Sequence, residues 1–391
     1  MTEHPLSGLR VLDLSRLLPG PFATLVLADL GAEVVKVEDP EGGDYLRWTP
    51  PLAGEQSGYF HALNRNKRSI RLDLKKPEGA AAFGVLARHF DVVVESFRPG
   101  VMDRLGIGWE VLRRLNPRLV LCSISGYGQD GPYRDRAGHD IDYCAIAGVL
   151  ALNGPAGHPL PLGVQAADIA GGAWPAVAGI LAGLYRRQLT GEGSLVDISM
   201  TEGVLSLLAV QHGGAAARGR PLERGRELLN GGSACYGVYR TRDDRFVALG
   251  ALEPRFFGRF CAAVGRPELA ERQFDGDGRG PREELEAIFA SRTRDEWERL
   301  GDEHDVCLAP VLEGDEPARN PQNLMRGTFL EIDTPWEGKW MPGLATPVRF
   351  EGVVPPRRPA PELGADTEAV LREAKFGEDE IETLRRAGAI G

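Results

Sequence analysis

The stretch "GLRVLDLSRLLPGPFATLVLADLGAEVVKVED", residues 8–39, decides the fold class. It begins with a short apolar run typical of a β-strand and continues with a helical segment that a proline starts and Gly31 ends. A second strand follows at residues 32–38. A strand, a helix and another strand in this order predict a βαβ unit, whose two strands lie parallel in one sheet.

The same alternation recurs further along the chain. Strand-like segments at residues 69–75, 91–97 and 117–125 alternate with helical segments at residues 77–90 and 109–116. This pattern predicts an α/β fold, with a parallel sheet covered by helices on both faces and ligands beyond the carboxyl ends of the strands. No G-x-G-x-x-G follows the first strand, so the sequence lacks the fingerprint of a nicotinamide dinucleotide site.

The character of the sequence changes after residue 210, which divides the chain into four predicted segments. Residues 1–210 form a large α/β domain, and residues 211–228 are a polar linker rich in Gly and Arg. Residues 229–320 form a smaller α+β domain, beginning with a hairpin that has an Asp-Asp turn. Residues 321–391 end in two helices and are expected to pack back on the large domain.

Composition narrows the class of partner. The 391-residue chain carries a net charge of -10, from 46 basic and 56 acidic residues, without a block of like charges, which argues against nucleic-acid and membrane-surface binding. Its five cysteines form no C-x-x-C pair and no metal-ligand spacing with the seven histidines. We therefore expect a cytoplasmic protein without disulfides or metal. The longest apolar run, residues 169–185, falls short of the ~20 residues that span a bilayer and predicts a buried helix.

Three residues are candidates for acid–base chemistry, and each also has a structural interpretation. His139 follows a glycine and precedes a helical stretch, whose backbone amides could bind an anion. Asp168 opens a Gly/Ala-rich stretch that allows another backbone to come close and whose apolar surroundings would raise a carboxyl pKa. Glu253 precedes a helix. The alternatives are a structural histidine and helix-capping carboxylates, and a capping role is favoured for Asp140.

Cations near strand ends could hold phosphate groups. Lys67, Arg68, Arg71 and Arg98 have this placement, although a solvated basic face would have the same pattern. No G-x-S-x-G motif occurs, which argues against a serine hydrolase. Nothing near Cys144 indicates an activated thiol.

Five segments of the chain resemble family III coenzyme A (CoA) transferases: residues 8–44, 64–75, 95–106, 125–143 and 190–203. Within that family the chain is most similar to the α-methylacyl-CoA racemase branch. Three further segments, "AGHDIDYCAIAGVLAL", "AADIAGG" and "GALEPRFF", stand where racemases carry their catalytic histidine, aspartate and supporting glutamate.

The resemblance implies an interlaced homodimer, with a Rossmann-like large domain, a small domain and long linkers in each chain. It places active sites at the interface of the two subunits. CoA would enter as part of an acyl-CoA thioester substrate, without a separate cofactor. Its adenosine end would lie near Arg71, Leu72, Asp73 and Leu74 and near Arg98, and its thioester near Gly138, Asp140 and Tyr143.

The resemblance also implies a mechanism, 1,1-proton transfer at the α-carbon of a 2-methylacyl-CoA. One acid/base group is needed on each face of the carbon, and His139 and Asp168 would supply them through an enolate. Main-chain amides near Gly138 and Asp140 would stabilise the enolate, and Glu253 would hold His139. The alternative is a CoA-transferase with Asp168 as nucleophile, which the transferase-like wording "VKVEDPEGGD" favours.

Overall fold

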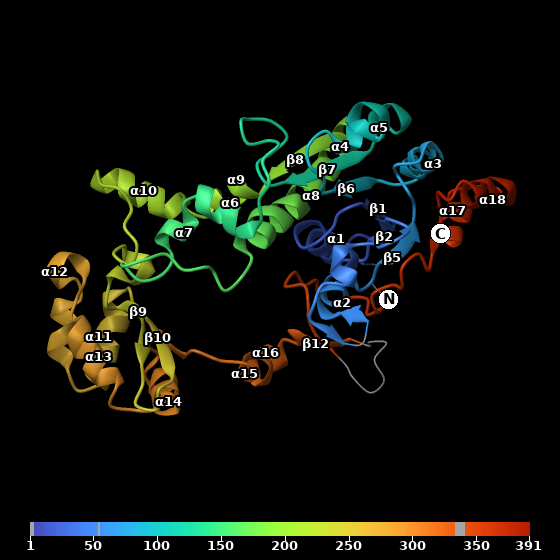
Figure 1. Cartoon of the computed structure of the whole chain (residues 1–391). Coiled ribbons are helices and arrows are strands. Elements are labelled where there is room, and N and C mark those ends of the chain that lie inside the picture. The colour runs from blue at the N-terminus through green and yellow to red at the C-terminus, as the bar shows by residue number, and fades with distance from the viewer. Residues whose placement is uncertain (1–3, 54, 333–340) are drawn as a thin grey trace. The chain divides into compact units, whose positions relative to one another are not determined.

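The computed structural model of the protein describes residues 4–53, 55–332 and 341–391 and divides into two compact units (Figure 1). The first unit comprises residues 1–147, 164–207 and 322–391, and the second comprises residues 148–163 and 208–321. The division differs from the expected segments in two places. The expected linker contains a helix, α10 (Ala209–Arg218), and residues 148–163 belong to the second unit.

A six-stranded sheet, with every pairing parallel, forms the centre of the first unit. Its strands are β1 (Arg10–Asp13), β2 (Glu33–Glu38), β5 (Arg68–Arg71), β6 (Val92–Glu95), β7 (Val120–Ser125) and β8 (Ser194–Ser199). They lie in the order β5-β2-β1-β6-β7-β8, which is the 3-2-1-4-5-6 order of Rossmann folds. The prediction of a parallel α/β fold is therefore confirmed. The order reverses between β1 and β6, and ligands of such sheets bind beyond the carboxyl ends of the strands at that point.

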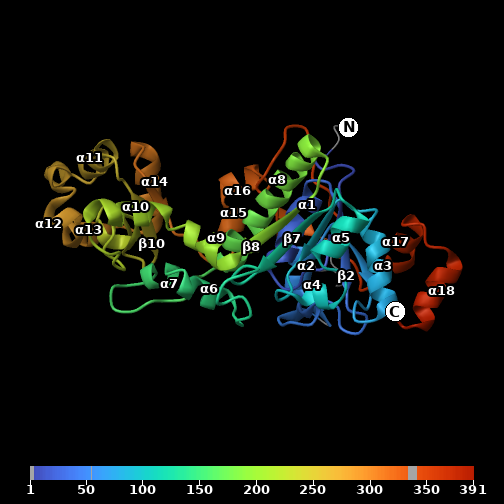
Figure 2. The same ribbon diagram turned by 90° about the horizontal axis from the view of Figure 1, so that it is seen from above.

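Helices cover both faces of this sheet. On one face, α3 (Pro77–Ala87), α5 (Trp109–Leu115), α17 (Thr367–Glu373) and α18 (Glu378–Arg386) bury their apolar side chains against Leu12, Val35 and Ile70. On the other face lie α1 (Pro19–Asp29) and α8 (Trp174–Thr190), which contact each other and the strands. The C-terminal helices lie beside α3 in both views (Figures 1 and 2).

Among the described residues, one helix is long and apolar enough to cross a membrane by length and composition. It spans Ala166–Thr190, and half of its most apolar window is buried inside the protein. Ile180 and Leu184 face the sheet, whereas Tyr185 and Leu189 are 64% and 70% exposed. The expectation of a buried helix is correct for one face of this helix and wrong for the other.

The second unit is built on a three-stranded antiparallel sheet, in the order β11-β10-β9. Its main elements are β9 (Tyr236–Arg240), β10 (Phe246–Gly250), α11 (Pro254–Ala263), α13 (Arg282–Phe289), α14 (Arg294–His304) and β11 (Leu308–Pro310). Phe260 and Phe289 stack with ring centroids 5.3 Å apart, inside a core that also contains Trp297. The Asp-Asp turn of the hairpin is present, with Asp244 in the left-handed region at φ 61°.

Shorter elements complete both units. The first unit also contains η1 (Tyr45–Arg47), β3 (Leu52–Ala53), β4 (Gln56–Ser57), α2 (Gly58–Asn64), α4 (Val101–Arg104), α6 (Asp140–Ile146), η2 (Ala166–Ala173), α9 (Met200–Ser206), β12 (Phe329–Ile332) and β13 (Met341–Leu344). The second also contains α7 (Val149–Leu152), η3 (Leu228–Gly232), η4 (Pro267–Arg272), α12 (Asp275–Gly278) and α15 (Glu316–Arg319). Helix α16 (Pro321–Met325) begins where the chain returns to the first unit.

Candidate active site

A cavity of about 540 Å³ lies in the first unit, at the carboxyl ends of three neighbouring strands. Its wall includes Arg16 and Leu17, which follow β1, Ser96 and Arg98, which follow β6, and Tyr127, which follows β7. The strand order reverses between β1 and β6, so the cavity is where a Rossmann-type sheet places its ligand.

His139 and Asp168 both line this cavity. They are far apart in the sequence: Asp140, the residue after His139, precedes Asp168 by 28 positions. His139 is the residue before α6, and its backbone N–H donates to Asp142 Oδ2 at 2.9 Å. Asp168 is the third residue of η2, a wide π-type turn at the start of the long apolar helix. Such turns are rare in proteins, and many of those that occur are found at functional sites. The fold therefore brings an imidazole and a carboxyl group to one cavity.

Asp140 links these two segments. Its Oδ1 accepts a hydrogen bond from the backbone N–H of Asp168 at 2.9 Å, and its Oδ2 lies 3.7 Å from the thiol of Cys144. It is the first residue of α6, and His139 occupies the N-cap position. The interpretation of Asp140 as a helix cap is therefore wrong, because its side chain is used to hold the backbone of Asp168.

The carboxyl group of Asp168 has an unusual pKa. Burial, first, and the nearby charge of Asp140, second, raise the pKa of Asp168 to about 7. The expectation that its surroundings raise this pKa is confirmed. A carboxyl group with this pKa is present in both protonation states near neutral pH, as a group that takes up and returns protons requires.

Close backbone packing fixes η2, the element that carries Asp168. A Cβ atom on Gly171 would lie 2.6 Å from the carbonyl oxygen of Met200, and one on Gly203 would lie 1.8 Å from the carbonyl oxygen of Gly171. Both distances are too short for a side chain, so α9 and η2 approach only because both residues are glycines. The prediction that small residues after Asp168 allow close approach of another backbone is confirmed.

Tyr143 fixes the loop before His139. Its hydroxyl donates to the carbonyl oxygen of Gly138 at 2.5 Å, and both residues line the cavity. Burial, first, and the charge of Asp168, second, raise the pKa of Tyr143 to about 12, so the hydroxyl stays protonated and can donate. A Cβ on Gly138 would lie 2.7 Å from the Tyr143 ring, which explains the glycine beside His139.

The residues expected to bind the adenosine end of CoA separate into two groups. Leu72, Asp73 and Leu74 line a smaller cavity of about 210 Å³, which shares Arg16 and Phe97 with the larger cavity. These shared residues make the two cavities neighbours, so one extended ligand can occupy both.

The two arginines of the expected adenosine site lie elsewhere. Arg98 lines the larger cavity, together with His139. Arg71 lines neither cavity, and its side chain packs against the C-terminal segment, where a Cβ on Gly364 would lie 2.6 Å from its Cγ. The expected contact of Arg71 with the ligand stays a prediction.

Two further cations expected to hold phosphates form structural ion pairs. The buried Lys67 Nζ lies 3.1 Å from Asp13 Oδ2 and donates to Asn64 Oδ1 at 2.9 Å. Burial is the main reason that the pKa of Lys67 is lowered to about 8. Arg68 pairs with Glu33 and Glu373 at 2.9 and 2.8 Å. The phosphate-binding interpretation is therefore wrong for Lys67 and Arg68.

Glu253 lies in the second unit, at the N-cap position of α11. It is exposed, and its backbone oxygen accepts from the N–H of Phe256 at 2.9 Å. Its side chain makes no capping bond to the helix. The expected hydrogen bond between Glu253 and His139 joins two units and stays a prediction.

Comparison with known proteins places the chain in a family. The sequence model of CoA-transferase family III matches residues 6–367. The chain belongs to this family. It is 37% identical to α-methylacyl-CoA racemase of Homo sapiens, over 97% of this chain and 96% of that protein. It is 36% identical to succinate–glutarate CoA-transferase of Agrobacterium fabrum, over 98% of this chain and 97% of that protein.

A solved structure supports the same assignment. The crystal structure of a CAIB/BAIF family protein from Brucella suis matches with a TM-score of 0.82 and 32% sequence identity, over 95% of this chain and 100% of that chain. The protein is thus an enzyme of CoA-transferase family III. Racemases and CoA-transferases match it at similar identity.

Several cavity residues of this family III enzyme were not predicted from the sequence. They are Arg16, Leu17, Ser96, Tyr127, Arg134 and Arg136. A usable signal existed for Arg16, because it follows the first predicted strand and the reversal of strand order places that position beside a ligand. No such signal existed for Arg134 and Arg136, which belong to the irregular segment between β7 and α6. Among the described residues, no group of three His, Cys, Asp or Glu could hold a metal ion.

The raised pKa of Asp168 has a consequence for stability. Because the folded state disfavours the carboxylate, the neutral form contributes stability that is complete below the ordinary pKa of 3.8 and is lost as pH rises through about 7. The amide of Asp168→Asn does not ionise, so this variant does not lose that stability as pH rises. We expect its stability relative to the wild type to rise between pH 4 and pH 7 by about 1–3 kcal/mol and then to level off.

Unfolding of both proteins in urea at a series of pH values measures this difference. The exposed Asp130→Asn is the control and should show no such trend. A wild type that gains stability relative to Asp168→Asn as pH rises would contradict the raised pKa.

Proposed function

We propose that this enzyme is a racemase that inverts the α-carbon of 2-methylacyl-CoA thioesters. The observation that carries the proposal is that two different proton-transfer groups, His139 and Asp168, line one cavity from separate elements. Inversion requires removal of the α-proton on one face of the carbon and its return on the other, so it needs one acid/base group on each side.

The two groups would act in turn through a planar enolate of the thioester. The base on one face removes the α-proton, the electron pair delocalises onto the thioester oxygen, and the acid on the other face returns a proton. Asp168, with its pKa of about 7, would serve one enantiomer, and His139 would serve the other. Main-chain N–H groups near Gly138 and Asp140 would donate to the enolate oxygen.

The charges of the cavity support a CoA thioester as substrate. Four arginines are among the residues that line it, Arg16, Arg98, Arg134 and Arg136. Guanidinium groups bind phosphate oxygens through paired N–H donors, and CoA carries several phosphates. The apolar acyl group would then lie toward the end of the cavity that contains His139 and Asp168.

A homodimer and the role of Glu253 form part of the same proposal. Helix α8 exposes Leu181, Tyr185 and Leu189, four residues apart on one face, and exposed apolar stripes are typical of protein interfaces. A second copy of the chain would cover them. Glu253 would accept a hydrogen bond from His139 and stabilise its imidazolium form.

A second candidate function is CoA transfer between carboxylic acids, which the similar identity to CoA-transferases favours. The Asp168 carboxylate would attack the acyl carbon of the donor thioester, giving a mixed anhydride and the CoA thiolate. The thiolate would attack the aspartyl carbon, releasing the donor acid and leaving an aspartyl-CoA thioester. The acceptor carboxylate would then repeat both steps in reverse. This mechanism requires no acid/base role for His139.

Proton exchange without an acceptor acid distinguishes the two functions. We expect the purified enzyme, given an (R)-2-methylacyl-CoA in deuterium oxide, to incorporate α-deuterium and form the (S) enantiomer. A 2,2-dimethylacyl-CoA, which has no α-proton, is the matched control and should remain unchanged. If folded enzyme exchanges no α-proton in a series of acyl chains but moves CoA to an added carboxylic acid, the racemase proposal is wrong.

A further inference from the structure

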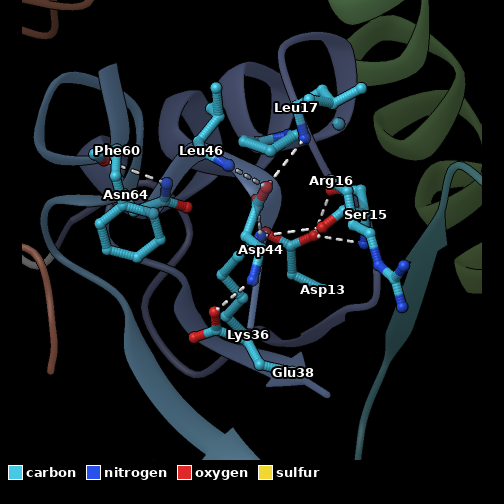
Figure 3. Close-up of polar contacts among 12 residues, drawn as sticks. Asp13, Ser15, Arg16, Leu17, Lys36, Glu38, Asp44, Leu46, Phe60 and Asn64 are labelled. Carbon is cyan, nitrogen blue, oxygen red and sulfur yellow. Dashed lines mark hydrogen bonds and ion pairs between the residues drawn. The ribbon is translucent and has the colours of Figure 1, made fainter. Parts of the chain in front are cut away.

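The turn that carries Arg16 and Leu17 is held from below by buried side chains of other segments (Figure 3). Leu17 has a φ of 63°, in the left-handed region that leucine rarely adopts. Arg16 lines both the larger and the smaller cavity, and Leu17 lines the larger one. A strained turn at this position persists only where its surroundings hold it.

Three backbone groups of the turn have side-chain partners. The Arg16 N–H donates to Ser96 Oγ at 3.0 Å, and the Leu17 N–H donates to Asp44 Oδ1 at 3.1 Å. The carbonyl oxygen of Ser15 accepts from Lys36 Nζ at 2.8 Å. The conformation of the turn is thus set by one side chain of the cavity wall, Ser96, and by two buried side chains behind the wall, Asp44 and Lys36.

Asp44 joins this turn to a second part of the wall. The same Oδ1 that accepts from Leu17 also accepts from the N–H of Leu46 at 3.0 Å, in the short helix η1, whose Tyr45 lines the larger cavity. The Arg16 guanidinium in turn donates to the Tyr45 hydroxyl at 3.3 Å. One carboxylate oxygen therefore sets the separation of two wall segments.

Lys36 holds this carboxylate in place. Its Nζ lies 2.9 Å from Asp44 Oδ2, and both side chains are at most 1% exposed. The Asp44 carboxylate is in a buried ion pair and also accepts hydrogen bonds from two N–H groups, so it has little freedom to rotate. Asp44 itself belongs to neither cavity wall in the described part of the chain.

We propose that Asp44 is a positioning residue for the CoA portion of the substrate, and this inference rests on the proposed function. It acts through Arg16, which it holds at the junction of the two cavities, and it touches neither the substrate nor the reacting carbon. Loss of this hold should weaken the binding of CoA while leaving the proton-transfer groups in place.

Asp44→Asn tests the inference because it keeps the shape and one acceptor oxygen but removes the charge that faces Lys36. We expect the Kd for CoA and the KM for the thioester to rise about tenfold, with kcat for exchange changed less than about twofold. The matched control is Asp29→Asn, a buried carboxylate paired with Arg65 and bonded to Thr346, away from both cavities. It should lower the melting temperature and leave the Kd unchanged.

A double-mutant cycle separates positioning from a general loss of stability. If Asp44 acts through Arg16, then Arg16→Ala already removes its effect, and Arg16→Ala with Asp44→Asn should bind CoA no more weakly than Arg16→Ala alone. Additive losses would overturn the inference. Ser96→Ala, which frees the Arg16 N–H without a buried charge, should also raise the Kd several-fold and serves if Asp44→Asn does not fold.

Calorimetry with CoA distinguishes failure of this inference from failure of the proposed function. A wild type that binds CoA and exchanges α-protons, together with an Asp44→Asn variant that binds equally well, would overturn the role of Asp44 alone. A wild type that binds no CoA would overturn both. Hydrogen exchange of the peptide containing residues 14–18 should show lost protection in Asp44→Asn and not in Asp29→Asn.

Discussion

Asp168→Ala is expected to reduce inversion of a 2-methylacyl-CoA in both directions by about 10²–10⁴-fold, the usual contribution of a positioned acid/base group. Asp168 lines the cavity, and its pKa is about 7. Its carboxyl group can therefore take up and return protons near neutral pH. Alanine removes the group and leaves the η2 backbone, whose N–H bond to Asp140 does not depend on the side chain.

The measurement is formation of the opposite enantiomer under saturating substrate, with the Kd for CoA measured in parallel. Because Asp168 faces the reacting carbon in the proposal, that Kd should change less than about threefold. The exposed Asp130→Ala is the control and should retain full activity. An Asp168→Ala enzyme with more than about a tenth of the wild-type rate of inversion would remove this residue from the racemase chemistry.

His139→Ala has the second large effect, and its pattern tells the two functions apart. In a two-base racemase it abolishes inversion in both directions, again by about 10²–10⁴-fold, because each direction needs both groups. Asp168 remains, so the enantiomer whose α-proton faces it should still exchange that proton with solvent, and return it to the same face. The other enantiomer should lose exchange altogether.

Starting from each pure enantiomer, deuterium content and configuration are measured separately. His89→Ala, at an exposed histidine of the same unit, is the matched control and should behave as the wild type. Equal loss of exchange from both enantiomers would mean that Asp168 does not work as an independent base. Retained transfer of CoA between carboxylic acids in His139→Ala would favour the transferase function, in which Asp168 acts without a histidine.

Much of the parallel sheet was predictable, because its evidence is local. Apolar runs, a proline at a helix start and a glycine after its end specify the first βαβ unit within 32 residues of sequence, and β1, α1 and β2 lie there. The boundaries were less exact. The strand expected at residues 91–97 ends at Glu95, because the residues after it turn away to form the cavity wall.

The candidate site was predictable only in part. The motifs around His139 and Asp168 carry their chemistry in neighbouring residues, whereas the importance of Arg16 depends on strand order, which no local pattern contains. Lys67 is the opposite case. Its sequence context shows a cation at a strand end, but its partner Asp13 is 54 residues away, so its burial could not be read from the sequence.

The discontinuity of the first unit has a consequence for protein synthesis. The last residue of strand β5 is bonded to helix α17: the N–H of Arg71 donates to the hydroxyl of Thr367, 296 positions later in the chain. The edge of the sheet at β5 is covered by α17 only after this segment has been synthesised. The second unit is complete once residue 321 has emerged. During synthesis, the unit made in the middle of the chain can therefore be complete first, while the β5 edge of the first unit stays uncovered until residues 367–386 have been made.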